Sequence, residues 1–592
     1  MKHPALLKKI PFVSALLLTV LSAFGGPPSG APGPATEDGK VRYFQAVMAG
    51  PWTVTAENRP PATFEFDRDQ RCDLAEIFGG KLPLRTRAVC RNRFTLPEAG
   101  RVVLGMGCDW WMRCRIDGKV ILDTFSTSNR LFPITVGNYG FELDLEAGEH
   151  TVELEIKTGR MSNHLAFGNI APVDPRVLYE PILTDFAPGR MAVSFVTAGA
   201  VPAAVDYRKK GSAEWRRVWH SIGGLKAQLE RFHRVELTGL EPDCDYEYRL
   251  VTEHPYRNFR EETGAVRSFR SAPAKFRPFR FFLISDTQFD WEERAERIDR
   301  VLKQEAFQKA DLLGHLGDFW SCAEDIELSL FPGLLDRFTG KPLIPARGNH
   351  EYLGHDATLY SRCFGDSVKL LEYGEVVFLV LDTGNGIRRK PPEPQVMNDP
   401  ESLWRGQKAF LEQAVASEAF RRARYRVVLA HGQPFCHPSP MLTEPLRALI
   451  DPFFAGKEPK VKIDLWVSGH RHRAIRTIPG TNQVYARQQL GAQRSGEAYH
   501  FPIVVLSGPN SRFNPEALQM STLELEFTAE GIHARARDLD GDCFDHFTVL
   551  PGGAVRDEFL RSDFRRFTVP EPETAGDHRP NGADPAKSAI QR

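Results

Sequence analysis

The sequence lacks a surplus of charge of either sign. Lys plus Arg and Asp plus Glu both number 76 in 592 residues, so the formal net charge is zero. Binding to nucleic acid or to an anionic membrane usually leaves an excess of basic residues. We therefore expect no nucleic-acid partner, although zero net charge is compatible with a local basic cleft.

A run of apolar residues long enough to cross a bilayer is also missing. The longest run, residues 10–24, has about 15 residues, fewer than the roughly 20 that a spanning helix needs. It follows Lys2, Lys8 and Lys9 and precedes small residues, as in a secretory signal peptide. We predict a signal peptide over 1–26, a flexible Pro/Gly/Ala-rich spacer over 27–39, and a secreted or periplasmic protein with no transmembrane segment after cleavage. An uncleaved anchor is the alternative, but no cysteine follows the run to carry a lipid.

Cysteine is scarce, with nine residues in the chain. Export permits disulfides, but an odd number leaves at least one thiol unpaired. If Cys108 and Cys114 lie on one continuous strand they are about 20 Å apart, too far to bond. The sequence predicts no pairing for the others.

Residues 40–173 have the pattern of an all-β domain. Apolar strands are expected at 101–104, 110–116, 141–145 and 151–157, with tight hairpins at 117–118 and 147–150. The pattern resembles a jelly-roll or galactose-binding-like sandwich. Trp110 and Trp111 suggest a carbohydrate or cell-surface contact, but neighbours on a strand face opposite sides, so at least one is expected in the core. A plain structural role is the alternative.

A second β module is predicted over 174–273. Strands are expected at 191–197, 205–208 and 246–250, and a Leu-Glu-Pro turn ends at Pro242. This module resembles a fibronectin type III-like domain.

The remaining chain repeats one pattern five times: a short apolar run ends and a side chain able to bind metal follows. The runs are residues 281–285 before Asp286, 312–317 before Asp318, 342–348 before Asn349, 427–430 before His431, and 463–469 before His470. Ligands of open α/β sheets gather beyond the carboxyl ends of strands, so the five ends can meet in one cleft. Carboxylate and amide oxygens mixed with imidazoles suit Zn, Mn or Fe, and a dinuclear site uses this many ligands. We predict an α/β domain over 274–552 and a largely disordered tail over 553–592.

These motifs, in this order, resemble the calcineurin-like metallophosphoesterase family. They are D-x-Q at 286–288, G-D at 317–318, G-N-H-E at 348–351, a strand-ending His431, and G-H-R-H at 469–472. The nearest branch is similar to the purple acid phosphatases, in which a fibronectin type III-like domain precedes the catalytic domain. The resemblance implies a two-sheet α/β sandwich after two all-β sandwiches.

The resemblance also implies a role for each residue. Asp318 would bridge two metal ions, which are divalent or trivalent Zn, Mn or Fe. The first ion would be held by Asp286, Gln288 and His472, and the second by Asn349, His431 and His470. Asn349 and His350 would bind substrate, and His350 would protonate the leaving oxygen, with Glu351 orienting its imidazole or forming a structural ion pair.

The function implied is a secreted, acid phosphatase-like hydrolase of phosphate monoesters, in which a metal-activated hydroxide attacks phosphorus. Two alternatives stay open: a phosphodiesterase of the same mechanism, and a cell-surface binding protein with a degenerate catalytic domain.

Two positions depart from the family pattern. Gln288 stands where the family usually has His, and Ser321 stands where the purple branch has an iron-binding Tyr. An amide oxygen is a poorer ligand than imidazole for Zn or Fe. The first ion is therefore expected to be labile, or to be Mn or Mg, and no purple colour is expected.

Overall fold

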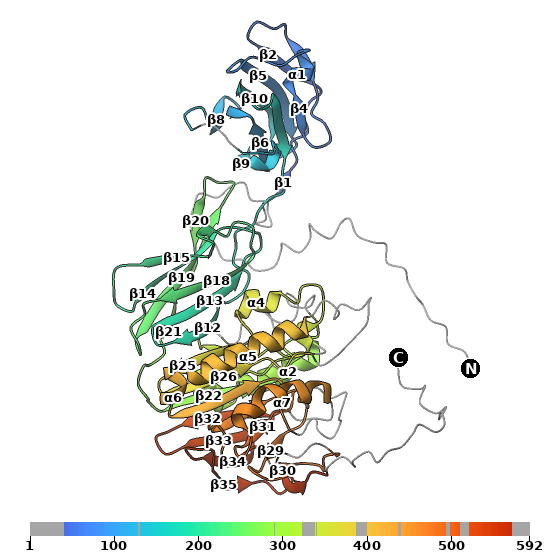
Figure 1. Cartoon of the computed structure of the whole chain (residues 1–592). Helices are drawn as coiled ribbons and strands as arrows, with labels where there is room; N and C mark the ends of the chain where they lie inside the picture. The colour runs from blue at the N-terminus through green and yellow to red at the C-terminus, as the bar shows by residue number, and fades with distance from the viewer. Residues whose placement is uncertain are drawn as a thin grey trace, which may run out of the picture. The chain divides into compact units, whose positions relative to one another are not determined.

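The computed structural model describes residues 41–127, 131–288, 291–322, 338, 340–385, 399–435, 440–492, 496, 498–508 and 520–570 (Figure 1). The chain divides into two compact units. Unit 1 comprises residues 1–174 with 253–261, and unit 2 comprises residues 175–252 with 262–592. The predicted signal peptide and spacer, together with Cys436, lie outside the described residues. Among the helices that the structure describes, none has the length and apolar character to cross a membrane.

Unit 1 is built from two β-sheets around one core. Apolar side chains of both sheets, such as Phe94 and Val152 of one and Leu104 and Leu165 of the other, form a single buried cluster. One sheet contains β1 (Tyr43–Phe44), β4 (Arg71–Asp73), β6 (Gly100–Cys108), β9 (Tyr139–Leu145) and β11 (His164–Asn169). The other contains β2 (Trp52–Ala56), β3 (Ala62–Phe64), β5 (Arg87–Leu96), β7 (Trp110–Ile116), β8 (Lys119–Asp123) and β10 (Gly148–Thr158). Two short helices, α1 (Leu74–Ile77) and η1 (Val136–Asn138), join strands.

Local turn patterns in unit 1 predicted one hairpin correctly and one wrongly. β7 and β8 pair across the Asp117-Gly118 turn, as predicted. The hairpin at 147–150 is wrong, because β9 pairs with β6 while β10 pairs with β5 and β7. The turn therefore carries the chain from one sheet to the other. Cys108 and Cys114 also lie on strands of different sheets, and the eight cysteines in the described residues are all free thiols.

Unit 2 begins with a β module whose core is continuous with the region that follows. Val193 and Val205 of the module belong to the same buried cluster as Phe279 and Phe378 of that region. One sheet has β12 (Ile182–Ala187), β13 (Arg190–Val196) and β18 (Phe232–Thr238). Another has β14 (Ala203–Lys209), β15 (Arg216–Trp219), β19 (Asp245–His254), β20 (Arg260–Thr263) and β21 (Arg267–Arg270), and β16 (Ser221–Ile222) pairs with β17 (Leu225–Lys226).

Two large mixed sheets form the rest of unit 2, and they pack face to face. Leu283 and Leu525 of one sheet and Val427 and Leu465 of the other fill the space between them. The first sheet has the order β24 (Leu343–Pro345), β23 (Leu312–His315), β22 (Phe279–Ile284), β32 (Thr522–Phe527), β33 (Ile532–Arg537), β34 (Cys543–Val549) and β35 (Val555–Leu560). The second has the order β25 (Lys369–Tyr373), β26 (Val376–Leu381), β27 (Tyr425–Ala430), β28 (Leu465–Ser468), β31 (Ile503–Val505), β29 (Ile475–Thr477), β30 (Gln483–Ala486) and β36 (Arg565–Thr568).

Helices cover the outer faces of both sheets (Figure 1). Ile298 and Phe307 cover Phe282 on the first sheet, and Leu411 and Ile450 pack in the cluster on the outer face of the second. The helices are α2 (Trp291–Leu302) and α3 (Glu305–Gln308) on the first sheet and α5 (Pro400–Ala416), α6 (Glu418–Arg422) and α7 (Pro440–Phe454) on the second, with α4 (Leu359–Phe364) beside the β module. This arrangement agrees with the predicted multidomain order of β regions followed by an α/β region.

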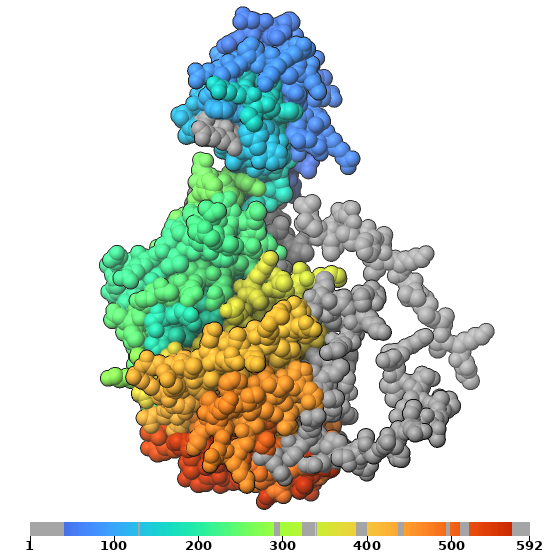
Figure 2. Space-filling view, viewed as in Figure 1, coloured from blue at the N-terminus to red at the C-terminus, as the bar shows by residue number. Residues whose placement is uncertain are grey.

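The predicted start of the tail at residue 553 is wrong. β35 pairs with β34 at the edge of the first sheet, and β36 pairs with β30 at the edge of the second. Phe564 and Val569 are buried, so this segment completes the core. In Figure 2 the red surface at the carboxyl-terminal end of the described chain is part of the packed body of unit 2. The predicted tail beyond residue 570 lies outside the described residues.

Candidate metal centre

Five strand ends bring the predicted ligands to one region of unit 2. Asp286 follows β22, Asp318 follows β23, Asn349 follows β24, His431 follows β27, and both His470 and His472 follow β28. β22, β23 and β24 are parallel neighbours, and so are β27 and β28. The carboxyl ends of parallel neighbours lie at the same sheet edge, so the ligands converge.

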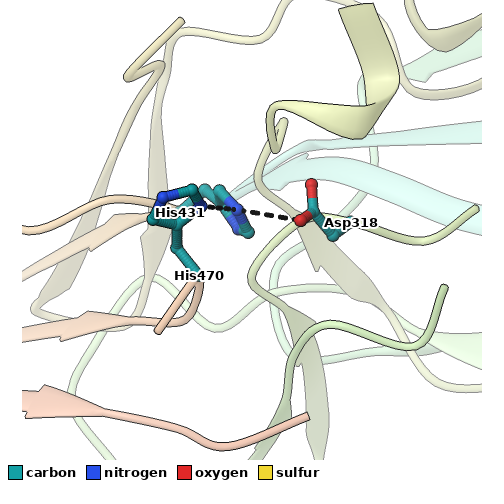
Figure 3. A group of neighbouring side chains, drawn as sticks. All are labelled: Asp318, His431 and His470. Atoms are coloured by element: carbon teal, nitrogen blue, oxygen red, sulfur yellow. Dashed lines mark hydrogen bonds and ion pairs between the residues drawn. The ribbon is translucent and has the colours of Figure 1, made fainter. Parts of the chain in front are cut away.

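Asp318, His431 and His470 form the tightest group (Figure 3). One ligand atom from each lies within 4.8 Å of the others. His431 Nε2 lies 3.2 Å from Asp318 Oδ2, 3.0 Å from His470 Nδ1 and 3.1 Å from Asn349 Oδ1. His431 Nδ1 lies 2.7 Å from the Leu316 carbonyl oxygen, so Nδ1–H donates there and Nε2 is left to face the group.

A second set of predicted ligands adjoins Asp318. Asp286 is fully buried, and its Oδ1 lies 3.7 Å from His472 Nε2. Its carboxylate accepts the backbone N–H of His470 at 3.0 Å. The Gln288 amide donates to Asp318 Oδ2 at 3.1 Å, while Gln288 Oε1 is buried with no hydrogen-bond partner. The structure thus brings all seven predicted ligands together, with Asp318 in contact with members of both sets.

The backbone at this site is held in an unusual conformation. Asp286, Asp318, His470 and His472 have φ values of 55°, 57°, 69° and 49°. Positive φ is uncommon for residues other than Gly, and such strain concentrates at functional sites. Each of these residues turns sharply out of its strand, which aims its side chain at the centre.

Glycines in two motifs are required because the chain approaches itself closely. A Cβ atom on Gly348 would lie 2.2 Å from Asp318 Oδ1. One on Gly469 would lie 1.8 Å from Ser285 Oγ and 2.4 Å from Asp286 Oδ2. No side chain fits at either position while the ligands keep their places.

The buried charges at the centre are strongly coupled. Burial opposes the charge on both Asp318 and His431, but their mutual attraction outweighs it. It raises the pKa of His431 to about 10 and, with the other imidazoles, holds the pKa of Asp318 well below its usual range. For Asp286 burial outweighs the nearby imidazoles and raises the pKa. Asp286 and Asp318 therefore depend on the same few histidines to balance their negative charges.

His350 contacts a backbone carbonyl group and the Asp318 carboxylate. Its Nδ1 lies 2.8 Å from the Ser321 carbonyl oxygen, and its backbone N–H donates to Asp318 Oδ1 at 2.9 Å. Glu351 is fully buried and accepts the backbone N–H groups of Asp318, Phe319 and Gly348 at 2.8, 2.8 and 2.6 Å. Burial, and next the charge of Asp318, raise the pKa of Glu351 to about 8. Glu351 thus anchors the loops that carry Asp318 and Asn349. Its role in orienting the imidazole, or in an ion pair, stays a prediction.

A group that the sequence did not predict supports the G-N-H-E loop. Arg347 Nε donates to Asp382 Oδ2 at 2.6 Å, and the Tyr352 hydroxyl donates to Asp382 Oδ1 at 2.9 Å. Gln407 Nε2 donates to the Asp382 carbonyl oxygen at 2.8 Å. The position of Asp382, directly after the apolar strand β26, was the available signal, because it repeats the strand-end pattern of the ligands. His437, another residue near the motifs, lies outside the described residues.

The side chains present fit bound cations. The cluster combines hard oxygens with imidazoles, the donor set of Zn, Mn or Fe. Buried polar atoms are normally paired, so the unpartnered Gln288 Oε1 beside Asp318 indicates a group that the protein alone does not supply. Asp286 and Asp318 are buried, whereas Asn349, His350, His470 and His472 are partly exposed.

A hollow lined by charged side chains lies elsewhere in unit 2. A cavity of about 520 Å³ is lined by Arg280, Glu524, Glu526, Arg535 and neighbours from α2 and α3. Its charges pair with one another, as Glu526 does with Arg280 at 3.2 Å and Arg535 at 3.0 Å. Arg280 lies near the start of β22, whereas Asp286 follows the end of that strand. The cavity therefore lies at the opposite end of β22 from the metal ligands.

Comparisons with known proteins identify the region around the centre. Residues 279–474 match the family model of the calcineurin-like phosphoesterases, which confirms the predicted family for this part of the chain. No curated protein sequence matches the chain. Among solved structures, it is similar to a purple acid phosphatase from seeds of yellow lupin (Lupinus luteus), at 13% identity and a TM-score of 0.46 over 84% of this chain and 97% of that one. It is also similar to PhoD, at 13% identity and a TM-score of 0.43 over 68% of this chain and 95% of that one. Likenesses this distant do not decide the branch, which stays a prediction.

Proposed function

We propose that this chain, which carries a calcineurin-like phosphoesterase domain, hydrolyses phosphate monoesters with two metal ions at the centre described above. The position of Asp318 carries the proposal. Its Oδ2 lies within 3.2 Å of both Gln288 Nε2 and His431 Nε2, which belong to the two different ligand sets. One carboxylate placed between two sets of ligands is suited to hold two cations at once. Asp286, Gln288 and His472 would then hold the first ion and Asn349, His431 and His470 the second.

Two bound cations would supply a hydroxide near neutral pH and neutralise the phosphoryl oxygens. The protein's own contribution is proton transfer and positioning. Because His350 Nδ1–H donates to the Ser321 carbonyl, Nε2 is the atom at which the imidazolium form of His350 would hold a transferable proton. A proton given from Nε2 to the leaving oxygen stabilises the departing alkoxide. Half-buried Asn349 and His350 are then the residues that meet the substrate.

The test is Asp318→Asn, which removes the negative charge shared by both cations. We expect metal content to fall from two ions per chain and turnover of p-nitrophenyl phosphate to be lost. Metal is measured by mass spectrometry on purified protein, and Asp540→Asn, at an exposed carboxylate of the same unit, is the control. Full metal occupancy with normal turnover in Asp318→Asn would overturn the proposal.

A weakened first site gives a second candidate function, a binding protein with a degenerate catalytic domain. The observation that favours it is that the Gln288 amide presents N–H, and not oxygen, to Asp318. Wild-type protein without bound metal or phosphatase activity would favour this candidate. Faster turnover of bis(p-nitrophenyl) phosphate than of the monoester would instead favour a phosphodiesterase.

We also propose that the chain is exported, to the medium or the periplasm, through the signal peptide predicted over 1–26. We further propose that the enzyme has acid phosphatase-like specificity and is related to the purple branch of the family. We assign residues 40–173 to a jelly-roll or galactose-binding-like domain and residues 174–273 to a fibronectin type III-like domain. The two-sheet packing around one core in unit 1 supports the first of these domain assignments. Amino-terminal sequencing of protein recovered outside the cytoplasm tests the export, since cleavage near residue 26 is expected.

A further inference from the structure

Two neighbouring tryptophans in unit 1 lie side by side at the start of β7. The ring centroids of Trp110 and Trp111 are 5.3 Å apart with 46° between the ring planes, and both side chains are partly exposed. The sequence predicted that the two would face opposite sides with at least one in the core, which is wrong. Trp110 has a φ of 95°, so the backbone turns there and the strand alternation fails.

This conformation is costly and is held in place by a buried carboxylate. A bulky residue is rarely found at positive φ and keeps that conformation only where its surroundings impose it. Asp109, which is 4% exposed, accepts the backbone N–H groups of Met161 and Ser162 at 2.9 and 2.8 Å. Asp109 thereby ties the turn before β7 to the loop after β10. A segment kept under strain to expose two indoles points to a function.

The segments next to the pair carry exposed apolar residues and basic residues. Met161 is 72% exposed and Leu84 is 45% exposed. The Arg85 guanidinium lies 5.6 Å from the Trp111 ring centroid, and Lys157 is the cross-strand partner of Trp111. The adjoining loop adds the exposed Arg160. Two acids lie close by and both are occupied: Asp109 is buried and accepts backbone N–H groups, and Glu155 pairs with Arg87 and Arg113.

We infer that the Trp110–Trp111 pair binds sugar rings of an acidic polysaccharide. One face of a pyranose presents C–H groups with partial positive charge, which suit the negative face of an aromatic ring. Two rings inclined to each other can contact successive sugars of one chain. Carboxylate or sulfate groups on the sugars would pair with Arg85, Lys157 and Arg160 through charge-assisted hydrogen bonds. The site is independent of the proposed phosphatase, because its residues lie in the other unit.

The test is binding of the full chain to polygalacturonate, with dextran as the neutral comparison, in affinity gel electrophoresis. We expect retardation by polygalacturonate at low salt, little by dextran, and at least a tenfold loss of affinity in the double variant Trp110→Ala/Trp111→Ala. Trp215→Ala is the matched control, since Trp215 is also partly exposed but stacks between Arg208 and Arg249 with no second indole. Arg85→Gln should weaken binding while leaving the rings in place.

Folding of the variants is checked by thermal denaturation. Trp110→Gly is informative because Gly adopts a φ of 95° without strain, so this variant should keep its melting temperature and still lose binding. Unchanged retardation of the double variant, equal retardation by dextran, or no retardation of the wild type by polygalacturonate would each overturn the inference.

Discussion

Gln288 is the residue at which the candidate centre departs most from its family, and its environment shows why the departure matters. The side chain is 1% exposed, and its two amide atoms differ: Nε2 donates to Asp318 and Oε1 has no partner. Leaving a buried acceptor unpaired costs about 1–3 kcal/mol. A cation that accepted Oε1 as a ligand would remove this cost, although an amide oxygen binds it less well than an imidazole does.

Gln288→His restores an imidazole, so we expect tighter binding at the first site and less stimulation of activity by added Mn or Zn. Titration of activity with each metal, before and after brief chelation, makes the comparison. Gln288→Asn keeps an amide but shortens it, and should need more metal than the wild type. If all three titration curves coincide, Gln288 is not a ligand.

His350 supports a prediction about proton transfer. His350→Ala should retain its metal ions and lose roughly 10²- to 10⁴-fold in rate, the range expected for a general acid. The loss should be smaller for p-nitrophenyl phosphate than for an alkyl phosphate, because a good leaving group needs no proton. His355→Ala, an exposed histidine of the same segment, is the control. An equal loss on all leaving groups would argue against proton donation.

Among single residues, the sequence predicts the metal ligands better than it predicts the residues that hold those ligands in place. Asp286, Asp318 and His431 each end an apolar strand, a pattern that can be read locally. The anchoring role of Glu351 cannot be read in this way, because the N–H groups of Asp318 and Phe319 that it accepts lie more than 30 residues away. The Arg347–Asp382 pair likewise joins the segment after β24 of the first sheet to the residue after β26 of the second, so it depends on how the two sheets pack.

Among the elements, the contact between the β module and the α/β region depends on a buried charge cluster. Asp185 lies at a bulge in β12 and is 7% exposed. Its Oδ1 lies 2.5 Å from Lys369 Nζ at the start of β25, and Arg234 of β18 also pairs with it. Lys369 Nζ also donates to the Phe364 carbonyl oxygen at the end of α4, at 2.8 Å. One carboxylate of the module thus holds two elements of the region that carries the candidate centre.

Breaking this cluster should destabilise unit 2. Asp185→Asn leaves Lys369 buried without its counter-charge, a change that typically costs about 3–5 kcal/mol. Denaturant unfolding measures the shift in midpoint. Asp185→Asn/Lys369→Met removes both charges and should recover part of the loss. Glu305→Gln, which breaks an exposed pair with Lys309, should leave the midpoint in place. A stable Asp185→Asn variant would mean that the cluster does not hold the two regions together.

The sequence predicts a strand or turn well when the residues of that segment alone determine it, and poorly when its strand partners determine it. The Asp117-Gly118 hairpin follows from its turn residues alone. The turn at 147–150 has similar residues but joins strands of different sheets, which only the pairing of β9 with β6 decides. The predicted tail includes β35 and β36, whose residues are mostly exposed, and these segments become strands only against the sheet edges that receive them.

For the molecule as a whole, the division into two units separates the candidate centre from the tryptophan pair. All seven predicted ligands lie in unit 2, and Trp110 and Trp111 lie in unit 1. The predicted domain boundaries at 173 and 273 follow from changes of pattern along the chain. The contacts divide the molecule differently, since residues 253–261 group with unit 1 while the β module shares a core with the α/β region.

This division predicts the effect of removing residues 1–175. We expect the remaining chain to fold, to bind metal and to hydrolyse p-nitrophenyl phosphate at a rate close to that of the full chain, because no predicted ligand or supporting residue is lost. Removal does leave Arg257 and His254 without Glu142, which lies 2.7 and 3.3 Å from them. Arg257 and His254 lie in residues 253–261, which group with unit 1. After truncation water replaces Glu142 around them, and we expect this change to affect that segment and not the metal centre. Circular dichroism and the melting temperature establish that the shortened chain is folded before activity is compared.

Polygalacturonate binding should disappear in the same protein. A folded, metal-loaded and inactive chain would show instead that unit 1 is needed for catalysis.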